Sequence, residues 1–419
     1  MSTDDCISRR AVGYLPEAPK FFDVLNDLWH PETNPNGVLN LGLAENGLMQ
    51  TEMTEFINSH PCASPHALTY GDGFTGSKQL KKAWCQLLNK YSNPCIPIIP
   101  SHLHVTPGVG NALECCAWSL FDQEDQVLVG RPYWTAFNYI FGIRAGVRVR
   151  EVSFRGTDPF SLEAVQEYEK EYLQAQKEAR CVKAILLCSP HNPLGRCYPK
   201  DVLRAYMSLC GKLGLHLIVD EIYALSVFEN AKMRNAVPFT SILSLQANGL
   251  MDPRKVHVQW GLSKDFGATG LRIGCLISQS NELFLKSLEG FSLFNFPSSL
   301  ADKAVASLLL NAEYNQQYIT TYQSRLTESY KHVTEFLDKH GIVYTESNAS
   351  LFLMVNLSSV GNRRFSNDDY ILGLLRQKKL YVTSATAYRN EEPGWFRIVI
   401  AHPKSVLDEG LKRLVEALS

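Results

Sequence analysis

The chain has 419 residues, of which 45% are hydrophobic and 20% charged, and its formal net charge is −1. This balance is typical of a globular protein with a large core, and the length suits two or three domains or one large α/β domain with a smaller one attached. No run of Lys or Arg stands out, so the charge pattern argues against binding to nucleic acid or to a membrane surface.

Eleven cysteines are scattered along the chain without a C-x-x-C pair. Several lie in apolar, strand-like runs, where Cys behaves as a small hydrophobic residue. We therefore expect free thiols in a reducing compartment, with no disulfide framework and no metal site. The first residues lack a signal-peptide pattern and no apolar run is long enough to span a bilayer, so we expect a cytoplasmic location.

Short apolar runs of β type alternate with helical patterns through the middle of the chain. The predicted strands are residues 104–106, 126–129, 147–153, 182–188, 215–219, 256–260 and 273–278, and the helices between them include 162–178 and 200–213. Continuous apolar strands that alternate with helices predict a mostly parallel sheet covered on both faces.

The pattern changes after about residue 305. A long amphipathic stretch predicts one extended helix at 313–340. Strands near 342–346, 351–357, 380–383 and 396–401, with helices near 368–378 and 405–418, predict a second, α+β unit. We expect a large domain at 56–305, a small domain at 306–419, and an N-terminal arm at 1–55 that joins the small domain.

Four residues in the middle of the chain suit a pyridoxal 5′-phosphate (PLP) site. Lys264 has the amine that such a site needs to hold the cofactor's aldehyde and to move the Cα proton of a substrate. Asp220 ends an apolar run at the tip of a predicted strand, and it would keep the ring nitrogen protonated so that the ring accepts electrons. Tyr223 and Asn192 would donate hydrogen bonds to the phenolate oxygen of the ring. Taken one at a time, the plainer interpretations are a surface position for Lys264, a helix N-cap for Asp220, a packing role for Tyr223 and a turn for Asn192. Their order along the chain favours the cofactor site.

The phosphate of the cofactor needs cations and backbone N–H groups. Residues 106–111 follow a predicted strand and open a helix, which places Val109 and Gly110 where a helix N-terminus favours a dianion. Arg272 would add a bidentate charge, unless it forms a surface or interface pair. Trp134 is a candidate to stack on the ring face, and a core position suits it equally.

Arg397 lies on a predicted strand of the second unit, after the sequence Glu-Glu-Pro-Gly-Trp-Phe. A fixed guanidinium there would bind a substrate carboxylate through two parallel hydrogen bonds. Without the other motifs, an ion pair between Arg397 and a neighbouring Glu would be the simpler interpretation.

Together these motifs resemble the fold-type I PLP enzymes, the aspartate aminotransferase superfamily of class I and II aminotransferases. Within it the chain is similar to 1-aminocyclopropane-1-carboxylate (ACC) synthases and their relatives. The resemblance is carried by residues 40–46 (Asn-Leu-Gly-Leu-Ala-Glu-Asn), 192–195 (Asn-Pro-Leu-Gly), 262–265 (Leu-Ser-Lys-Asp) and 392–397 (Glu-Pro-Gly-Trp-Phe-Arg). It implies a large domain with a mostly parallel seven-stranded sheet, a smaller α+β domain, PLP as cofactor, an amino-acid substrate and a homodimer.

The resemblance also implies a role for each matching residue. Lys264 would bind the cofactor and Arg397 the substrate α-carboxylate, Asn192 would contact the substrate as well as the cofactor, and Glu45 would lie near the substrate side chain. The remaining cofactor contacts would come from Asp220, Tyr223, Asn192, Trp134, Arg272, Ser263, Val109 and Gly110.

Some positions depart from the family's pattern. Gly261 replaces a phosphate-binding Ser and residues 108–110 lack the usual hydroxyl, so phosphate binding would depend more on backbone N–H groups and Arg272. The tyrosine that the family inserts into the partner's site aligns with Phe74, and Tyr70 would replace it only with a shifted loop. These changes indicate a retained cofactor site with an altered substrate.

Three functions are compatible with this pattern. The first is a lyase that cleaves a carbon–sulfur bond, which the resemblance to ACC synthases and to related lyases of fungal secondary metabolism implies; the altered loop disfavours ACC formation itself. The second is an aminotransferase, which needs the same residues. The third is a non-enzymatic homologue, which the presence of Lys264 and Asp220 disfavours.

Overall fold

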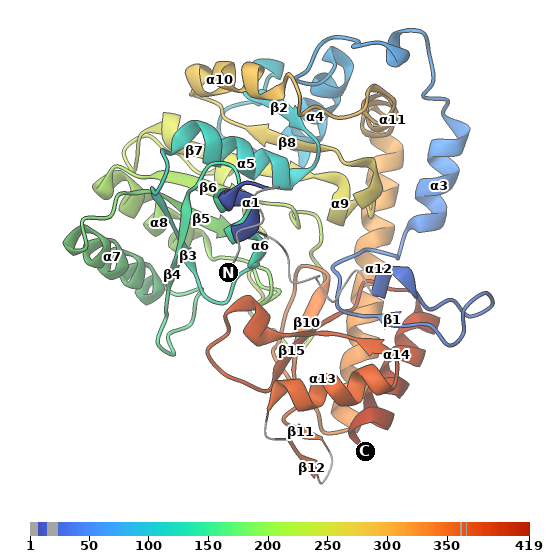
Figure 1. Cartoon of the computed structure of the whole chain (residues 1–419). Helices are drawn as coiled ribbons and strands as arrows, with labels where there is room; N and C mark the ends of the chain where they lie inside the picture. The colour runs from blue at the N-terminus through green and yellow to red at the C-terminus, as the bar shows by residue number, and fades with distance from the viewer. Residues whose placement is uncertain (1–6, 15–23, 361–362, 366) are drawn as a thin grey trace.

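The computed structural model describes residues 7–14, 24–360, 363–365 and 367–419. Its main feature is a seven-stranded sheet with the strand order β2-β8-β7-β6-β5-β3-β4 (Figure 1). Strand β8 runs antiparallel to both of its neighbours, and the other strands of the sheet run in one direction. The mostly parallel α/β fold predicted from the sequence is confirmed.

The strands of this sheet follow the apolar runs closely. They are β2 (Leu103–Thr106), β3 (Gln126–Gly130), β4 (Arg148–Val152), β5 (Val182–Cys188), β6 (His216–Asp220), β7 (Val256–Gly261) and β8 (Gly274–Ile277). Strands β2, β7 and β8 are buried at every position, as expected for a sheet that is covered on both faces.

Helices cover both faces of the sheet. Helix α6 (Ala136–Gly142) leads from β3 outward to β4, whereas α7 (Leu162–Lys177) leads back from β4 to β5. Because such crossovers are right-handed, these two helices lie on opposite faces. Helix α5 (Val109–Leu120) packs with α6, α10 (Glu282–Ser292) packs with α5, and α8 (Lys200–Leu213) packs with α7.

A four-stranded antiparallel sheet, β14-β15-β10-β9, forms the other part of the molecule (Figure 1). Its strands are β9 (Val343–Tyr344), β10 (Phe352–Asn356), β14 (Thr383–Ser384) and β15 (Trp395–Val399), and it is accompanied by α13 (Asp368–Gln377) and α14 (Lys404–Leu418). Prediction placed one strand near 380–383; two short strands, β13 (Leu380–Tyr381) and β14, occupy that region.

Two segments join the parts of the molecule. The long helix α12 (Ala312–Lys339) contacts both α11 (Ser299–Leu310) and α14. Strand β1 (Leu39–Asn40) of the N-terminal arm pairs in parallel with β13. The domain boundaries near residues 55 and 305 remain a prediction, and residues 1–6 and 15–23 of the arm lie outside the described residues. Among the described helices, none is both long and apolar enough to cross a membrane.

Candidate active site

Five of the predicted site residues follow strands that end at one edge of the seven-stranded sheet. The residues after β2, β3, β5, β6 and β7 include, in that order, Val109, Trp134, Asn192, Tyr223 and Lys264. Because the parallel strands share this edge, their carboxyl ends meet there, where open α/β sheets bind ligands. Strand β8 runs the other way, so Arg272, which precedes it, comes to the same edge.

Lys264 lies in the short helix α9 (Leu262–Asp265) and is held by residues from the N-terminal arm. Its Nζ donates a hydrogen bond to the carbonyl oxygen of Ala44, and its own carbonyl oxygen accepts one from Asn46 Nδ2 at 2.8 Å. Burial lowers the pKa of Lys264 to about 8, and the positive charge of Arg397 acts in the same direction. About a tenth of this amine is therefore neutral, and nucleophilic, at pH 7, far more than for an ordinary lysine with a pKa of about 10.4.

Asp220 is the last residue of β6 and is only 3% exposed. Its Oδ1 accepts a hydrogen bond from the backbone N–H of Ile222 at 3.1 Å. Burial raises the pKa of this carboxyl to about 7, while the charge of Lys264 acts in the opposite direction. A cationic partner would stabilise the ionised form of Asp220, and a protonated ring nitrogen is such a partner.

Arg397, on β15, is 3% exposed. Its Nη1 donates to Asn192 Oδ1 at 2.9 Å and its Nη2 to the carbonyl oxygen of Gly42 at 2.6 Å. The guanidinium carbon lies 4.6 Å from the ring centroid of Phe352 and 4.7 Å from that of Tyr388. Among the described residues, Nε has no hydrogen-bond partner and no carboxylate pairs with the guanidinium. A buried cation that meets only neutral acceptors is well suited to bind an added carboxylate.

The charges of Asp220 and Arg397 act on the pKa of the Tyr223 hydroxyl in opposite directions. Tyr223 is buried, and its ring packs edge-on against Phe352 with the centroids 5.4 Å apart. Burial raises the pKa of its hydroxyl well above the ordinary value, although the charge of Arg397 opposes this. The hydroxyl therefore stays protonated and is a hydrogen-bond donor.

The predicted phosphate end has a close approach between backbone and side chain. Gly108 caps α5 with a φ of 86°, which favours glycine, and a Cβ there would lie 2.5 Å from Arg272 Nη2 and displace this guanidinium. Arg272 also donates to the carbonyl oxygens of Thr269 and Pro107. The guanidinium thus lies beside the first N–H groups of α5, those of Val109 and Gly110, which have no partners within the helix.

The remaining predicted site residues differ in how deeply they are buried. Ser263 is buried and its carbonyl oxygen accepts a hydrogen bond from Thr269 Oγ1 at 2.9 Å, whereas Glu45 is exposed and its charge raises the pKa of Lys264. Trp134 is 37% exposed. Tyr70 is 71% exposed and packs with Phe74 and Phe296, so the structure does not bring it to the other candidates within one chain.

Sequence reasoning missed several groups of the site. The carbonyl oxygens of Gly42 and Ala44 hold the two cations, and the rings of Phe352 and Tyr388 enclose Arg397. The motif at 40–46 was recognised, but backbone acceptors are not visible in residue identities. Phe352 and Tyr388 occur without any local signal.

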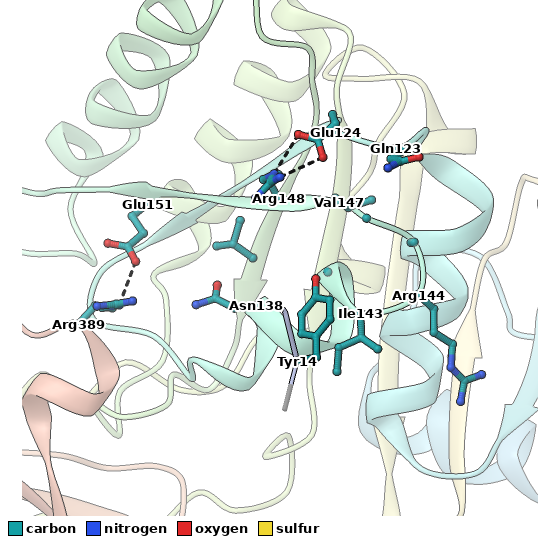
Figure 2. Close-up of a pocket in the computed structure, with 14 residues that line it drawn as sticks. Tyr14, Gln123, Glu124, Asn138, Ile143, Arg144, Val147, Arg148, Glu151 and Arg389 are labelled. Carbon is teal, nitrogen blue, oxygen red and sulfur yellow. Dashed lines mark hydrogen bonds and ion pairs between the residues drawn. The ribbon is translucent and has the colours of Figure 1, made fainter. Parts of the chain in front are cut away.

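A separate cavity of about 490 Å³ lies between α6 and β4 (Figure 2). Two of its lining ion pairs are Arg148 with Glu124, at 3.0 Å, and Arg389 with Glu151, at 3.1 Å. None of the predicted site residues lines it. The described residues also contain no cluster of His, Cys, Asp and Glu that would hold a metal ion.

The sequence matches the family model described as "Aminotransferase class I and II" over residues 37–414. The chain belongs to this family. Among the curated relatives of this aminotransferase-family chain are the probable aminotransferase aclI of Aspergillus oryzae and 1-aminocyclopropane-1-carboxylate synthase 2 of Cucurbita pepo. The first is 31% identical over 91% of this chain and 90% of its own length, and the second 30% identical over 93% and 80%. A human relative at 29% identity, covering 94% of this chain and 69% of its own length, is named a probable inactive ACC synthase-like protein.

Solved structures show the same fold. A double mutant of the Thermus thermophilus aspartate aminotransferase superposes with a TM-score of 0.76 at 20% identity, over 98% of this chain and 99% of the other. The aromatic aminotransferase of Pyrococcus horikoshii gives a TM-score of 0.75 at 21% identity, over 95% and 98%. At these identities the likeness concerns the fold alone.

Members of this family use PLP, and the residues of this chain fit that group. Among the described residues, the Lys264 amine has only a backbone carbonyl as its hydrogen-bond partner and Arg397 Nε has no partner, while Asp220 offers a buried carboxylate. Arg272 beside the start of α5 supplies charge and N–H groups for a phosphate. The chain is an enzyme of the PLP-dependent aminotransferase-like family.

Proposed function

We propose that this enzyme acts on an α-amino acid or amino-acid conjugate with a free α-carboxylate and cleaves a carbon–sulfur bond in it. The observation that carries the substrate class is Arg397, whose buried guanidinium meets only neutral acceptors among the described residues. A substrate carboxylate would replace these weaker contacts with charge-assisted hydrogen bonds.

The residues divide the work in this proposal. When bound, PLP supplies an electron sink for the bond that breaks at Cα. Lys264 removes the Cα proton, because its lowered pKa leaves a neutral amine to accept it. Asp220 holds a proton at the ring nitrogen, and Tyr223 and Asn192 orient the ring. The pair of electrons from the C–S bond leaves with the sulfur of the substrate.

Residues 42–45 support the proposed reaction class. Gly42 accepts a hydrogen bond from Arg397 and Ala44 accepts one from Lys264, so this segment runs between the proposed carboxylate-binding and proton-transfer groups. Glu45 comes next and acts electrostatically on Lys264. A second carboxylate on the substrate would be repelled there, which disfavours dicarboxylic amino acids. The similarity to a Cucurbita pepo ACC synthase also supports an elimination.

An aminotransferase is the second candidate. It is favoured by the names of relatives from Aspergillus oryzae, Leptosphaeria maculans and Claviceps purpurea, each a probable aminotransferase at 31–32% identity. Such a reaction would use Lys264, Asp220 and Arg397 in the same roles, and it would differ in where Lys264 returns the proton.

We further propose a homodimer in the cytosol. Tyr70, Leu68 and Phe294 expose most of their apolar surface, which a partner subunit would cover. The cysteines of the described residues are free thiols and most are buried, which favours a reducing compartment.

The test is to incubate the protein and PLP with S-adenosylmethionine, cysteine conjugates, or common amino acids plus a keto-acid acceptor. We expect release of a thiol or thioether without any need for the acceptor. Products that appear only with the acceptor, and carry the donor's amino group, would instead establish an aminotransferase.

A further inference from the structure

Asp265 directly follows Lys264, and its carboxylate is almost fully buried. It accepts three hydrogen bonds. The backbone N–H of Leu225 and the indole Nε1 of Trp260 donate to Oδ2 at 3.1 and 2.7 Å, and Ser226 Oγ donates to Oδ1 at 2.6 Å. The carboxylate therefore joins the turn at Lys264 to a second turn.

That second turn carries other residues of the proposed site. The backbone N–H of Ser226 donates to the carbonyl oxygen of Tyr223 at 2.9 Å, which closes the turn that begins after Asp220. Ser226 Oγ also lies 2.7 Å from the hydroxyl of Tyr322 on α12. The hydrogen bonds of Asp265 thus link the turn that carries Tyr223 to the turn that carries Lys264.

The buried carboxylate of Asp265 is unusual because its hydrogen-bond donors carry no charge. All three donors to Asp265 are neutral, and among the described residues no cation lies within ion-pair distance of it. Burying a carboxylate without a cation is unfavourable, and a neutral residue would fill the same space at lower cost. A carboxylate does, however, accept several hydrogen bonds at once and so fixes their donors relative to one another.

We propose that Asp265 is a positioning residue that holds the Tyr223 turn against the Lys264 turn and so sets the geometry in which the cofactor is bound. This inference rests on the proposed function, because it concerns the residues that would bind PLP.

Two variants separate geometry from charge. In Asp265→Asn the amide oxygen would accept from Leu225 and Trp260, which share one oxygen in the native protein, and the amide NH₂ would donate to Ser226 Oγ. Ser226 would then donate to Tyr322, so each of these side chains keeps at least one hydrogen-bond partner. Asp265→Ala removes the link and leaves its buried donors without an acceptor.

The readouts are the dissociation constant of PLP and the pH midpoint of the visible absorbance of the lysine-bound cofactor, with kcat as a third. For Asp265→Ala we expect weaker PLP binding, a displaced midpoint and a kcat lower by about 100-fold, a loss that a misplacement of about 1 Å can cause. For Asp265→Asn we expect values close to those of the wild type.

Asn230→Ala is the matched control for lost stability. Asn230 is buried and bonds to Tyr330, Glu346 and the carbonyl oxygen of Ser347, without contact to the proposed site. We expect a lower Tm but an unchanged spectral midpoint. If Asp265→Ala does not fold, Ser226→Ala removes one of the three donors, and we expect a smaller displacement in the same direction.

Two results would overturn the proposal. Unchanged PLP affinity and midpoint in Asp265→Ala (or in Ser226→Ala, if that variant has to replace it) would leave Asp265 a purely structural residue. An Asp265→Asn protein that behaves like Asp265→Ala would show that charge, not position, matters. Neither result would affect the proposed function, which fails only if the wild-type protein forms no lysine-bound PLP or turns over no amino acid.

Discussion

Asn192 and Arg397 are 205 residues apart in the chain, yet Asn192 Oδ1 accepts a hydrogen bond from Arg397 Nη1 at 2.9 Å. Asn192 follows β5 of the large sheet and Arg397 lies on β15 of the small one. The proposed cofactor contact and the proposed carboxylate contact are therefore coupled directly. A substrate that binds Arg397 would also meet the Asn192 amide.

Removing the Lys264 amine should abolish the reaction. In Lys264→Ala we expect turnover to fall by at least about a thousandfold and the visible absorbance of lysine-bound PLP to disappear, because no other group replaces this nucleophile. Circular dichroism should show an intact fold. Lys255→Ala is the matched control, since Lys255 Nζ donates to the carbonyl oxygen of Gly214 and has no other hydrogen-bond partner in the described part of the chain. Retained turnover in Lys264→Ala would contradict the assignment.

Removing the Arg397 guanidinium should weaken substrate binding much more than cofactor binding. Each charge-assisted hydrogen bond is worth about 1.5–3 kcal/mol, so Arg397→Leu should raise KM for an α-amino acid by about 100-fold or more. The dissociation constant of PLP should change little. Arg148→Leu, which removes an exposed guanidinium paired with Glu124, serves as the control. An unchanged KM would mean that the substrate is anchored elsewhere.

The lowered pKa of Lys264 predicts how fast the apoprotein captures PLP. The neutral amine is the reactive form, so the rate should rise about tenfold per pH unit up to about pH 8 and then level off. Stopped-flow absorbance at a series of pH values measures it. An ordinary lysine has a pKa of about 10.4, so a rate that still climbs steeply at pH 9.5 would exclude the environment described for Lys264.

A second buried carboxyl predicts how the apoprotein's stability depends on pH. Glu221 accepts hydrogen bonds from Ser241 Oγ and the Ile242 N–H, and burial raises its pKa to about 8. The folded state then keeps a proton that the unfolded state has released, so this contribution to stability is complete below the unfolded pKa near 4 and is lost as pH rises to 8.

The loss of stability that Glu221 causes should be measurable between pH 6.5 and 8. In denaturant titrations of the apoprotein, the wild type should lose about 1–2 kcal/mol of unfolding free energy relative to Glu221→Gln, which cannot ionise. Burial lowers the pKa values of histidines such as His104 and His216 to about 4, so they make stability rise with pH until the unfolded histidine, with a pKa of about 6.5, is deprotonated. Because both proteins contain these histidines, their contribution cancels in the comparison. Parallel curves for the two proteins would show that Glu221 is ionised when buried.

Much of the fold followed from local patterns in the sequence. Continuous apolar runs predicted the strands of the large sheet, since a strand buried on both faces has few polar positions. The position of Asp220 at a strand tip predicted its place at the ligand-binding edge, because parallel strands share that edge. Lys264, which follows β7, comes to the same edge for the same reason, whereas Arg272 comes there because it precedes β8, which runs the opposite way.

Other parts of the site depend on contacts that no local pattern encodes. Asp265 was visible in the motif around Lys264, but its partners Leu225 and Ser226 lie about 40 residues away. The rings of Phe352 and Tyr388 meet Arg397 only through the pairing and turns of the small sheet. Side-chain partnerships of this kind arise from tertiary packing.

The most direct test is to incubate the protein with PLP, reduce it with borohydride, digest it and locate the modified lysine by mass spectrometry. The geometry described above predicts a single phosphopyridoxyl group on Lys264, lost in Lys264→Ala and retained in Lys255→Ala. A label on another lysine, or none at all, would contradict the assignment of this edge of the sheet as the cofactor site.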